Sequence, residues 1–579
     1  MKTRLRMMLL SGAALAAAAP ALHVSHPPQF GGIVGFLLSP QGRVVLQSSN
    51  HPLAQALRER LGANPAPPPS IEEVSLPPDA PAQDPCGSAA GTRFNLEPRT
   101  PPAALPQNGT VVDFLAGAGA AGDDIVVGAA SDFRGTFGGL ANSGTGYYVH
   151  RGGGAASACG ADFEGGLPPL LDSGRILPGG GDPDTEADPA RSAFFIADVR
   201  LTPSVSAIGL FRTTAPALLN ATACPAGTHS LAASQTCWPV GVEILPSQVG
   251  GLLVAPHLAV DPRASGAGAG DVYVSAVLSD LTGIHAVIAA CRNNLSVCSP
   301  AVPVSGSDIS VLSPYIRVRP DVQTHPGGAV TLTYVNTRDS GPPDFLPIFD
   351  VRYVNCTPQG APNPPSCTAP IPVATESQPV GGKAGLGGGS LAAAQFLIST
   401  SPKHEHRVDA NGVETYIVWD RCQVPVPAGT GVCPDSSIVM AASADRGATW
   451  KFAAVDNGRG DQYFPALSTD STNTINIAYY SSRADSSAHR AQVMLRQIPP
   501  GAATPDPVSD PLTLTALGMD PSGDFFLGGT FIGSNIGVAA RSTAGGRRAY
   551  VHFMHNAVPG TYNGAPSPEQ NNHLTRFDY

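Results

Sequence analysis

The chain has 579 residues, which is more than one hydrophobic core usually serves, so several domains or one large repeat architecture are expected. Charged residues make up only 13% of the sequence, and it contains 65 Gly and 58 Pro, which indicates many short strands joined by turns. An apolar content of 42% without a three-residue Gly period excludes a collagen helix and a disordered chain. The formal charge of −10 provides no basic surplus for phosphate groups, so we expect no nucleic acid partner.

The first 21 residues have the pattern of a secretory signal peptide. Three basic residues precede a short apolar run that ends at Ala19-Pro-Ala21, which predicts cleavage after Ala21. This run is too short to span a bilayer comfortably, and no later segment is apolar for about 18 residues, so we expect no transmembrane segment in the mature chain. The predicted location is therefore secreted or periplasmic.

Ten cysteines are consistent with such an oxidising compartment. Their spacing predicts four local disulfides and one longer one, because four pairs are close in sequence and two cysteines are left over. No Cys-x-x-Cys motif is present, so zinc ribbons and thioredoxin-like redox sites are not supported. The predicted pairs are Cys224/Cys237, Cys291/Cys298, Cys356/Cys367, Cys422/Cys433 and Cys86/Cys159.

Three landmarks recur along the chain with a period near 66 residues. The first is the spacing of Cys159, Cys224, Cys291 and Cys356, which is 65, 67 and 65 residues. The second is a short extended segment that begins at a proline, found at Pro183–Asp188, Pro256–Asp261, Pro314–Arg319 and Pro465–Asp470. The third is a β-rich run with a polar end, found at Ile125–Arg134, Phe194–Arg200, Val272–Asp280, Thr331–Asp339, Tyr416–Arg421, Ile475–Asp485 and Ala549–Asn556.

These repeats predict an all-β fold, a β-propeller of four-stranded antiparallel blades over residues 106–579. Seven β-rich runs give seven blades, with six as the alternative if the first and last repeats share one blade. Because the last repeat lacks a strand, we expect an N-terminal strand to complete it and close the ring. Residues 22–105 match no repeat and are interpreted as an extension with a proline-rich linker.

One hairpin of the fifth repeat carries a family motif. The segment Ser443-Ala-Asp445-Arg-Gly447-Ala-Thr449-Trp450 resembles the Asp-box of sialidases and related BNR-repeat propellers. In that family the box is structural, which the resemblance extends to Ser443, Asp445, Gly447, Thr449 and Trp450. It also implies a site with three arginines, a Tyr nucleophile activated by Glu, and an Asp acid/base. The family's early F/Y-R-I-P motif is absent, and the nearest string, Tyr315-Ile316-Arg317, has a different order.

Polar residues at the end of the second strand of each repeat are the candidate site. If the repeats are equivalent blades, these side chains converge near one rim of the central channel, where arginines bind a carboxylate and an Asp transfers a proton. The alternative interpretation is that Asp–Arg pairs tie neighbouring blades together. The predicted ligand-binding residues are Arg134, Arg200, Arg338, Arg421 and Arg483, and the predicted catalytic residues are Asp132, Asp420 and Tyr463.

Two functions are compatible with this pattern. The first is a glycan-directed protein that hydrolyses a terminal acidic sugar, and the second is a non-catalytic extracellular propeller that binds a protein or a polysaccharide. We expect no cofactor and no metal in the site, although the loop Gly179–Asp184 is a candidate for structural calcium. His404-Glu405-His406 lacks a third metal ligand by spacing and is interpreted as a solvated loop cluster.

Overall fold

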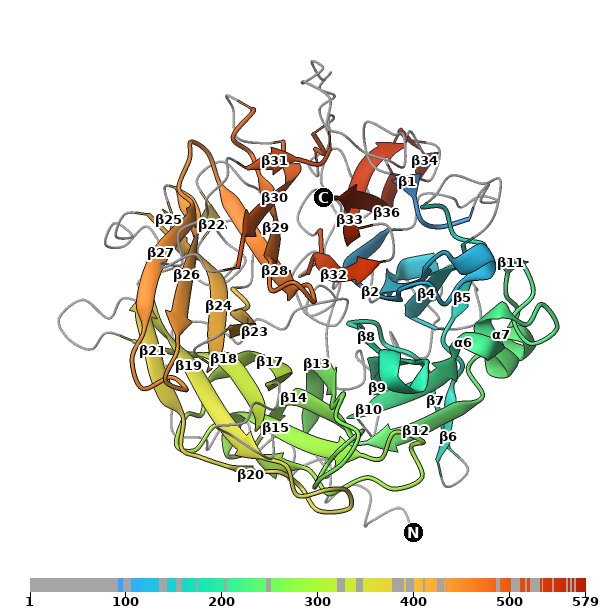
Figure 1. Cartoon of the computed structure of the whole chain (residues 1–579), viewed down its shortest axis with the longest axis horizontal. Coiled ribbons are helices and arrows are strands. Elements are labelled where there is room, and N and C mark those ends of the chain that lie inside the picture. The colour runs from blue at the N-terminus through green and yellow to red at the C-terminus, as the bar shows by residue number, and fades with distance from the viewer. Residues whose placement is uncertain are drawn as a thin grey trace, which may run out of the picture.

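The computed structural model is a seven-bladed β-propeller of antiparallel sheets (Figure 1). The seven-blade prediction is confirmed, and the six-blade alternative is wrong. The structure describes residues 92–96, 106–134, 143–152, 159–172, 175–202, 206–245, 251–319, 329–339, 347–376, 390–391, 400–409, 412–423, 432–433, 435–485, 490–500, 511–515, 518–520, 532–533, 535–543, 546–558, 561–562, 565–566 and 569–579. The predicted signal peptide, most of the extension and Cys86 lie outside these residues, so those predictions stay untested.

Each blade begins with an inner strand beside the central axis, followed by a second strand farther out (Figure 1). The inner strands are β2 (Gln107–Leu115), β8 (Asp184–Asp188), β13 (Leu252–Val260), β17 (Val311–Arg319), β23 (Lys403–Asp409), β28 (Gln462–Thr469) and β32 (Gly537–Thr543). The second strands are β3 (Ile125–Asp132), β9 (Ala193–Leu201), β14 (Val272–Asp280), β18 (Ala329–Asp339), β24 (Gly412–Cys422), β29 (Ile475–Ser481) and β33 (Gly546–Val558). The proline-led landmarks are therefore inner strands, and the β-rich runs are second strands.

The third and fourth strands complete each blade toward the circumference. The third strands are β4 (Thr145–His150), β10 (Ser206–Thr214), β15 (Gly283–Cys291), β19 (Pro347–Thr357), β26 (Ser436–Ser443), β30 (Gln492–Ile498) and β36 (Glu569–Asp578). The outer strands are β5 (Phe163–Gly166), β12 (Val240–Ile244), β16 (Val302–Pro303), β20 (Ser366–Cys367) with β21 (Ile371–Glu376), β27 (Lys451–Asp456), β31 (Leu512–Thr513) and β1 (Thr92–Arg93).

Short elements lie outside the four-strand pattern. They are the paired strands β6 (Leu170–Asp172) with β7 (Arg175–Leu177), β22 (Ser390–Leu391) with β25 (Val432–Cys433), and β34 (Thr561–Tyr562) with β35 (Ala565–Pro566), the strand β11 (Gly227–Thr228), the helices α6 (Ala215–Leu219) and α7 (Leu231–Cys237), and two single 3-10 turns at Ala120–Gly122 and Pro189–Arg191. No helix in the described part of the chain is long and apolar enough to cross a membrane.

The ring is closed by a strand from the beginning of the chain, as the incomplete last repeat predicts. Strand β1 pairs antiparallel with β36, so that Thr92 faces Leu574 and Arg93 faces His573. The propeller therefore takes in residues ahead of position 106, where the predicted boundary lay. Phe94, which follows β1, is fully buried and packs edge-on against His552 of β33, with ring centroids 5.3 Å apart.

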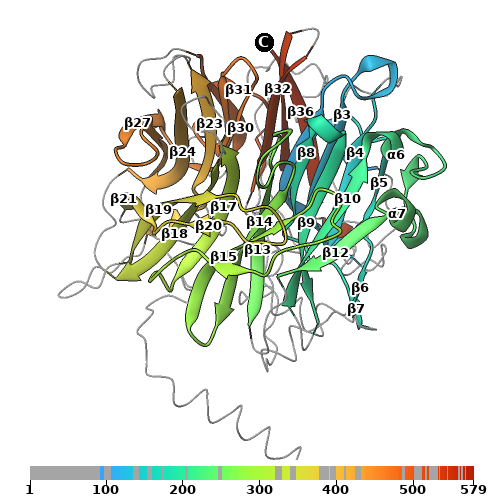
Figure 2. The same ribbon diagram turned by 60° about the horizontal axis from the view of Figure 1, so that its bottom comes forward.

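Among the described residues the hydrophobic core is divided into seven clusters, and each cluster fills the space between two neighbouring blades. Figure 2 shows the blades side by side around the axis, so that the broad face of each blade lies against its neighbour. Apolar runs such as Phe194–Ala197 of β9 are continuous because successive side chains point to opposite faces of the blade and both faces are covered. Burial of these faces provides most of the stabilisation, at about 25 cal/mol per Å² of apolar surface.

The four local disulfides occur as predicted: Cys224–Cys237, Cys291–Cys298, Cys356–Cys367 and Cys422–Cys433. Cys356–Cys367 links β19 to the outer strand β20, and Cys291–Cys298 links the end of β15 to the turn that precedes β16. Cys422–Cys433 links the end of β24 to the short strand β25, and Cys224–Cys237 lies in the segment between β10 and β12. With no transmembrane helix described, these disulfides fit an extracellular or periplasmic protein. The Cys86–Cys159 pairing stays a prediction.

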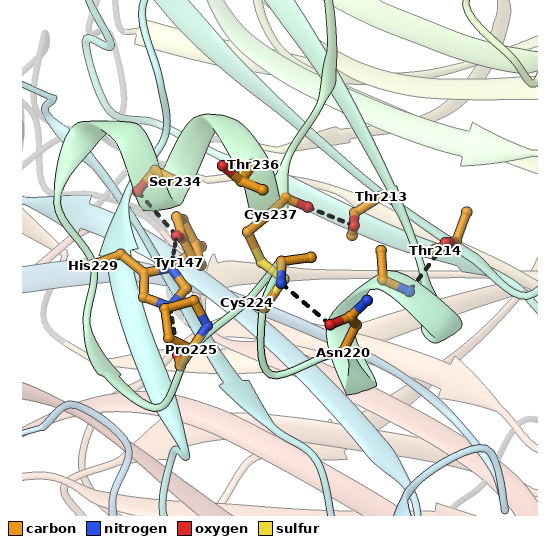
Figure 3. The surroundings of a disulfide bond; sticks show 12 residues. Tyr147, Thr213, Thr214, Asn220, Cys224, Pro225, His229, Ser234, Thr236 and Cys237 are labelled. Carbon is orange, nitrogen blue, oxygen red and sulfur yellow. Dashed lines mark hydrogen bonds between the residues drawn. A yellow bond between two sulfur atoms is a disulfide. The ribbon is translucent and has the colours of Figure 1, made fainter.

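The Cys224–Cys237 disulfide closes an insertion that joins blades 1 and 2 (Figure 3). Strand β11 of this insertion pairs in parallel with β5 of blade 1. The Tyr147 hydroxyl of β4 forms hydrogen bonds with His229 Nδ1 at 2.6 Å and Ser234 Oγ at 3.0 Å. Thr213 of β10 donates to the Cys237 carbonyl at 2.7 Å, which attaches the insertion to blade 2.

We expect Phe94→Ala to reduce the free energy of unfolding by about 3–5 kcal/mol, because it leaves a cavity where the closing strand packs on blade 7. The control is Phe452→Ala, because that side chain is 52% exposed and its loss should cost less than about 1 kcal/mol. Urea denaturation monitored by tryptophan fluorescence measures both changes. Equal losses would contradict a stabilising role for the closing strand.

Candidate functional site

The predicted rim residues form ion pairs at the ends of the second strands. In blade 1, the Arg134 guanidinium binds Asp132 at 2.6 Å and Glu164 at 2.8 Å, and in blade 2, Arg200 binds Asp198 at 2.6 Å. These residues are buried, and burial is the largest influence on the guanidinium pKa values. It lowers the pKa of Arg200, whereas the carboxylates beside Arg134 raise the pKa of that residue well above its usual value.

The other three predicted arginines also have carboxylate partners. Arg338 binds Asp350 at 2.8 Å within blade 4, Arg421 of blade 5 lies 3.6 Å from Glu376 of blade 4, and Arg483 of blade 6 lies 3.3 Å from Asp456 of blade 5. The last two are ties between neighbouring blades, as the alternative interpretation expects. Tyr463 and Asp420 are buried, and the Tyr463 ring stacks on Tyr480 with centroids 5.7 Å apart.

None of these eight predicted residues lines either of the two cavities that the described residues form along the axis. The reason is the antiparallel pairing of the first two strands in each blade. A second strand ends beside the start of its inner strand, as Asp132 pairs with Gln107. The wider cavity opens at the opposite ends of the inner strands, so the predicted rim and the wide opening lie on different faces.

The side chains that line the cavities come from the inner strands instead. Several inner strands are preceded or interrupted by a bulge in which one residue has a positive φ: Gly109, Asp182, Ala255, Ser313 and Phe464. In the last four cases the next residue is a proline, which explains the proline-led landmark. Residues two and four positions beyond the bulge then face the axis in successive layers.

We define two layers by this register. The first layer consists of the residues two positions beyond the bulge, and the second layer of those four positions beyond it. Strand β23 fits the same register through Ser401-Pro402. The first layer contains Val111, Asp184, His257, Tyr315, Lys403 and Ala466, and the second contains Asp113, Glu186, Ala259, Arg317, Glu405 and Ser468.

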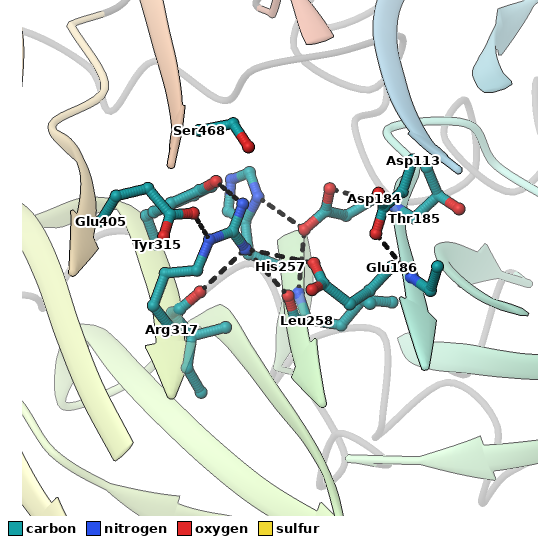
Figure 4. Close-up of polar contacts among 12 residues, drawn as sticks. Asp113, Asp184, Thr185, Glu186, His257, Leu258, Tyr315, Arg317, Glu405 and Ser468 are labelled. Atoms are coloured by element: carbon teal, nitrogen blue, oxygen red, sulfur yellow. Dashed lines mark hydrogen bonds and ion pairs between the residues drawn. The ribbon is translucent and has the colours of Figure 1, made fainter. Parts of the chain in front are cut away.

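Arg317 lies at the centre of the second layer, between carboxyl groups from blades 2 and 5 (Figure 4). Its Nε donates to Glu405 Oε1 at 2.5 Å, and its Nη1 lies 3.5 Å from Glu186 Oε2. Nη1 also donates to the Leu258 carbonyl at 3.3 Å, and Nη2 contacts the Tyr315 hydroxyl. One guanidinium therefore connects blades 2, 3, 4 and 5 across the channel.

Two further basic side chains, His257 and Arg541, contact the carboxylates beside this centre. Asp184 Oδ2 accepts hydrogen bonds from the Leu258 amide at 2.9 Å and faces His257 Nδ1 at 3.2 Å. Both carboxylate oxygens of Asp113 accept hydrogen bonds from Arg541 Nη2, at 2.8 Å each. Asp113 also accepts a hydrogen bond from the Ala187 amide at 2.7 Å. The pKa of Asp184 is lowered because His257 and Arg317 outweigh the opposing effect of burial.

Glu186 and Glu405 have unusual acidity for carboxyl groups. Burial raises the pKa of Glu186 to about 8, with Arg317 opposing the shift and Asp113 adding to it. Burial also raises the pKa of Glu405, and the short hydrogen bond from Arg317 opposes that shift. At neutral pH, Glu186 is therefore mostly protonated. Glu186 and Glu405 both contact the Arg317 guanidinium, and the pKa of each is raised by burial.

The channel has a narrow part and a wide part. The narrow cavity has a volume of about 220 Å³ and contains both layers, whereas the wide one, about 640 Å³, lies at the C-terminal ends of the inner strands. Glu405 and Arg541 line both cavities. The mainly polar second layer thus lies where the narrow part meets the wide opening, with Glu405 lining both parts and Glu186 lining the narrow part.

Sequence reasoning missed these channel residues although it located their strands. Tyr315 and Arg317 were considered only as a poor match to a family motif, and Glu405 as part of a loop cluster. The signal that was available is the alternation after each X-Pro step, which places residues at +2 and +4 on one side of a strand. This alternation does not reveal which side chains from different blades meet at the axis.

The expectation of a solvated His404-Glu405-His406 loop is wrong. These residues belong to β23, where His404 and His406 are buried and Glu405 points to the channel. Thr331 Oγ1 lies 2.8 Å from Nε2 of each histidine, and Thr333 and Thr415 bind their Nδ1 atoms. Burial lowers the pKa of both imidazoles well below the usual value.

The segment Ser443–Trp450, which resembles an Asp-box, forms the turn between β26 and β27. Asp445 accepts hydrogen bonds from the Thr449 amide at 2.8 Å and the Thr449 hydroxyl at 2.6 Å, and Gly447 adopts a φ of 89°. Trp450 packs edge-on against Tyr353, with ring centroids 5.5 Å apart. The turn lies outside both cavities.

The described residues contain no group of three or more His, Cys, Asp or Glu side chains arranged to hold a metal ion. In the loop that was a candidate for calcium, Asp182 Oδ2 accepts from the Ala255 amide at 3.0 Å, and Asp184 is bound as described above. The calcium site stays a prediction.

No protein-family model and no curated protein matches this sequence. Among solved structures, a protein of unknown function from Dyadobacter fermentans is 10% identical, with 68% of this chain and 92% of that chain covered and a TM-score of 0.40. The Hadza microbial sialidase Hz136 is 8% identical, with coverage of 78% and 73% and a TM-score of 0.36. The α-L-arabinofuranosidase Arb93A from Fusarium graminearum is 10% identical, with coverage of 71% and 97% and a TM-score of 0.38. The functional argument therefore rests on the channel itself.

We expect Arg317→Ala to destabilise the protein by about 3–5 kcal/mol, because it leaves Glu405 buried without its cation. Arg338→Ala is the matched control, since that side chain is 47% exposed and its pair with Asp350 should contribute less than about 1 kcal/mol. Unfolding in urea at pH 7 compares the two variants. A smaller loss for Arg317→Ala than for Arg338→Ala would contradict the central role of Arg317.

The buried histidines predict acid sensitivity. Because the folded-state pKa values of His404 and His406 are depressed, the unfolded chain binds protons more readily, and stability falls as the pH drops below about 6.5. Each histidine adds at most about 1.4 kcal/mol per pH unit to this slope. His406→Gln should reduce the slope of unfolding free energy between pH 6.5 and 5, whereas Phe452→Ala, which removes no titratable group, should leave it unchanged. An unchanged slope in His406→Gln would refute this assignment.

Proposed function

We propose that this protein is a glycan-directed β-propeller that hydrolyses a glycosidic bond at the second layer of its channel. The observation that carries the proposal is the pair Glu186 and Glu405, which reach one guanidinium from blades 2 and 5. Glycoside hydrolysis requires a carboxylic acid and a carboxylate around the bond that breaks. Glu186, whose pKa burial raises to about 8, provides the acid, and the hydrogen bond from Arg317 supports Glu405 as the carboxylate.

In this proposal Glu186 is the general acid. It transfers its proton to the glycosidic oxygen as the bond from that oxygen to the anomeric carbon breaks. Glu405 is the general base, which removes a proton from the water that attacks the anomeric carbon. The products are two hydroxyl compounds, and the proton held by Glu405 returns to Glu186 through solvent. Arg317 positions both carboxyl groups without taking part in the proton transfers.

The narrow and wide parts of the channel suit the end of a glycan chain. The narrow cavity accommodates the terminal unit, and the wide opening accommodates the remainder of the chain. This supports action on terminal sugars. The predicted acidic sugar requires an anion-binding group. The five predicted arginines are engaged by carboxylates outside the cavities, and Arg317 and Arg541 are engaged by carboxylates inside them.

A binding function without catalysis is the second candidate, and the saturation of the arginines by carboxylates favours it. Ion pairs of this kind rigidify a scaffold without leaving charges free for chemistry. The first candidate is preferred because neither the raised pKa of Glu186 nor the cavity around it is needed for a scaffold.

We expect Glu186→Gln to lower kcat for a susceptible 4-methylumbelliferyl glycoside by at least about 100-fold, because the amide cannot donate the proton. Wild-type turnover should fall as the pH rises through about 8, where Glu186 loses its proton. The control is Arg421→Ala, at the predicted rim, which should retain turnover. Assays use a panel of sialosides, glucuronides and neutral glycosides.

A loss of turnover in Arg421→Ala with retention in Glu186→Gln would overturn this site in favour of the predicted rim. Absence of turnover across the panel by folded wild-type protein would favour the binding function.

A further inference from the structure

Lysine is very rare in this protein, and one lysine lies inside the channel. Only four of the 34 basic residues are lysines: Lys2, Lys383, Lys403 and Lys451. Of the two that the structure describes, Lys451 is exposed, whereas Lys403 is only 4% exposed and lines the narrow cavity. A buried amine in a chain that otherwise uses arginine requires a specific explanation.

The Lys403 ammonium has little compensation for its burial. Its Nζ donates one hydrogen bond to the Ile536 carbonyl at 3.4 Å and lies 5.8 Å from the centre of the Tyr315 ring. Among the described residues no carboxylate forms an ion pair with it, in contrast to Arg317 and Arg541. An ammonium can donate three hydrogen bonds, so two donors remain for a ligand.

The surrounding charges do not replace such a partner. Asp184 is the carboxylate that acts on the Lys403 ammonium, but Asp184 Oδ2 is already bound by His257 and the Leu258 amide. Burial lowers the pKa of Lys403 to about 8, with Asp184 opposing and Arg317 adding to the shift. An anion in the narrow cavity would stabilise the protonated form and complete the hydrogen bonds.

The position of Lys403 also orients a ligand relative to the two Glu residues. Lys403 and Glu405 are two residues apart on β23, so their α-carbons are separated by about 6.6 Å along the strand. Lys403 belongs to the first layer, away from the wide opening, and Glu405 to the second layer, next to it. An anionic group at Lys403 would thus place the rest of its sugar ring toward Glu186, Glu405 and the opening.

We propose that Lys403 binds the carboxylate of a terminal sugar acid in the narrow cavity, in the layer away from the wide opening. This inference rests on the proposed function for its orientation, but it concerns binding and can be tested without turnover. It assigns anion recognition to one lysine in the channel and not to the five arginines predicted at the rim.

The test is calorimetric titration of the wild-type protein and Lys403→Met with glucuronate, and with glucose as the uncharged counterpart. We expect glucuronate to bind at least about tenfold more tightly than glucose to wild type, with this preference lost in Lys403→Met and kept in the surface control Lys451→Met. Lys403→Met should fold, because methionine has a similar volume and removes a buried charge that has no carboxylate partner. N-acetylneuraminate, titrated in parallel, distinguishes a nine-carbon sugar acid from a six-carbon one.

A second measurement needs no variant. Reductive methylation at pH 8 followed by mass spectrometry should modify Lys403, and glucuronate should protect Lys403 but not Lys451. The inference is overturned if no sugar acid binds in preference to glucose, if Lys403→Met keeps the preference, or if neither sugar acid protects Lys403.

Hydrolysis and anion binding can fail separately. Preferential glucuronate binding without any turnover would refute the proposed hydrolysis and support Lys403 as the anion site. Turnover of neutral glycosides only, with no preference for sugar acids, would support Glu186 and refute the role of Lys403.

Discussion

Closure of the ring is the constraint on which the rest of this structure depends. Each blade has two apolar faces, and only a neighbouring blade can cover each of them, so an open array would leave two faces and two sheet edges in water. The pairing of Thr92 with Leu574 removes that problem by completing blade 7 with residues from both ends of the chain. The inner strands then surround one axis, and polar residues of strands remote in sequence meet there.

Arg317 shows how this arrangement brings charges together. A buried guanidinium requires partners on several sides, and a propeller axis can provide them from different blades. Glu186 and Glu405 are 219 positions apart in the sequence, yet both reach the same side chain. Because the arginine is shared, neither carboxyl group is fully compensated, and burial raises the pKa of both.

Much of the fold could be predicted from the sequence because its signals are local and repeated. The β-rich runs, the proline-led segments and the cysteine spacing each mark one position in a blade, and the repeat period orders them. The channel could not be predicted in the same way. Tyr315 and Arg317 have no local feature that distinguishes them from other residues of a half-buried strand, and their importance depends on which residues of blades 2, 3 and 5 they meet. The predicted rim arginines were chosen for a local pattern, and that pattern proved to belong to ion pairs such as Arg134 with Asp132.

Blade 7 is built from strands that are far apart in the sequence, and this determines when the protein can finish folding. During synthesis, Thr92 emerges long before Leu574, so β1 has no strand to pair with while the first six blades are being made. Native-like pairs of neighbouring blades can form progressively, but the nascent chain retains an open edge until β36 is available. Ring closure is therefore a single event of high contact order, and it delays the burial of the channel until all seven blades are present.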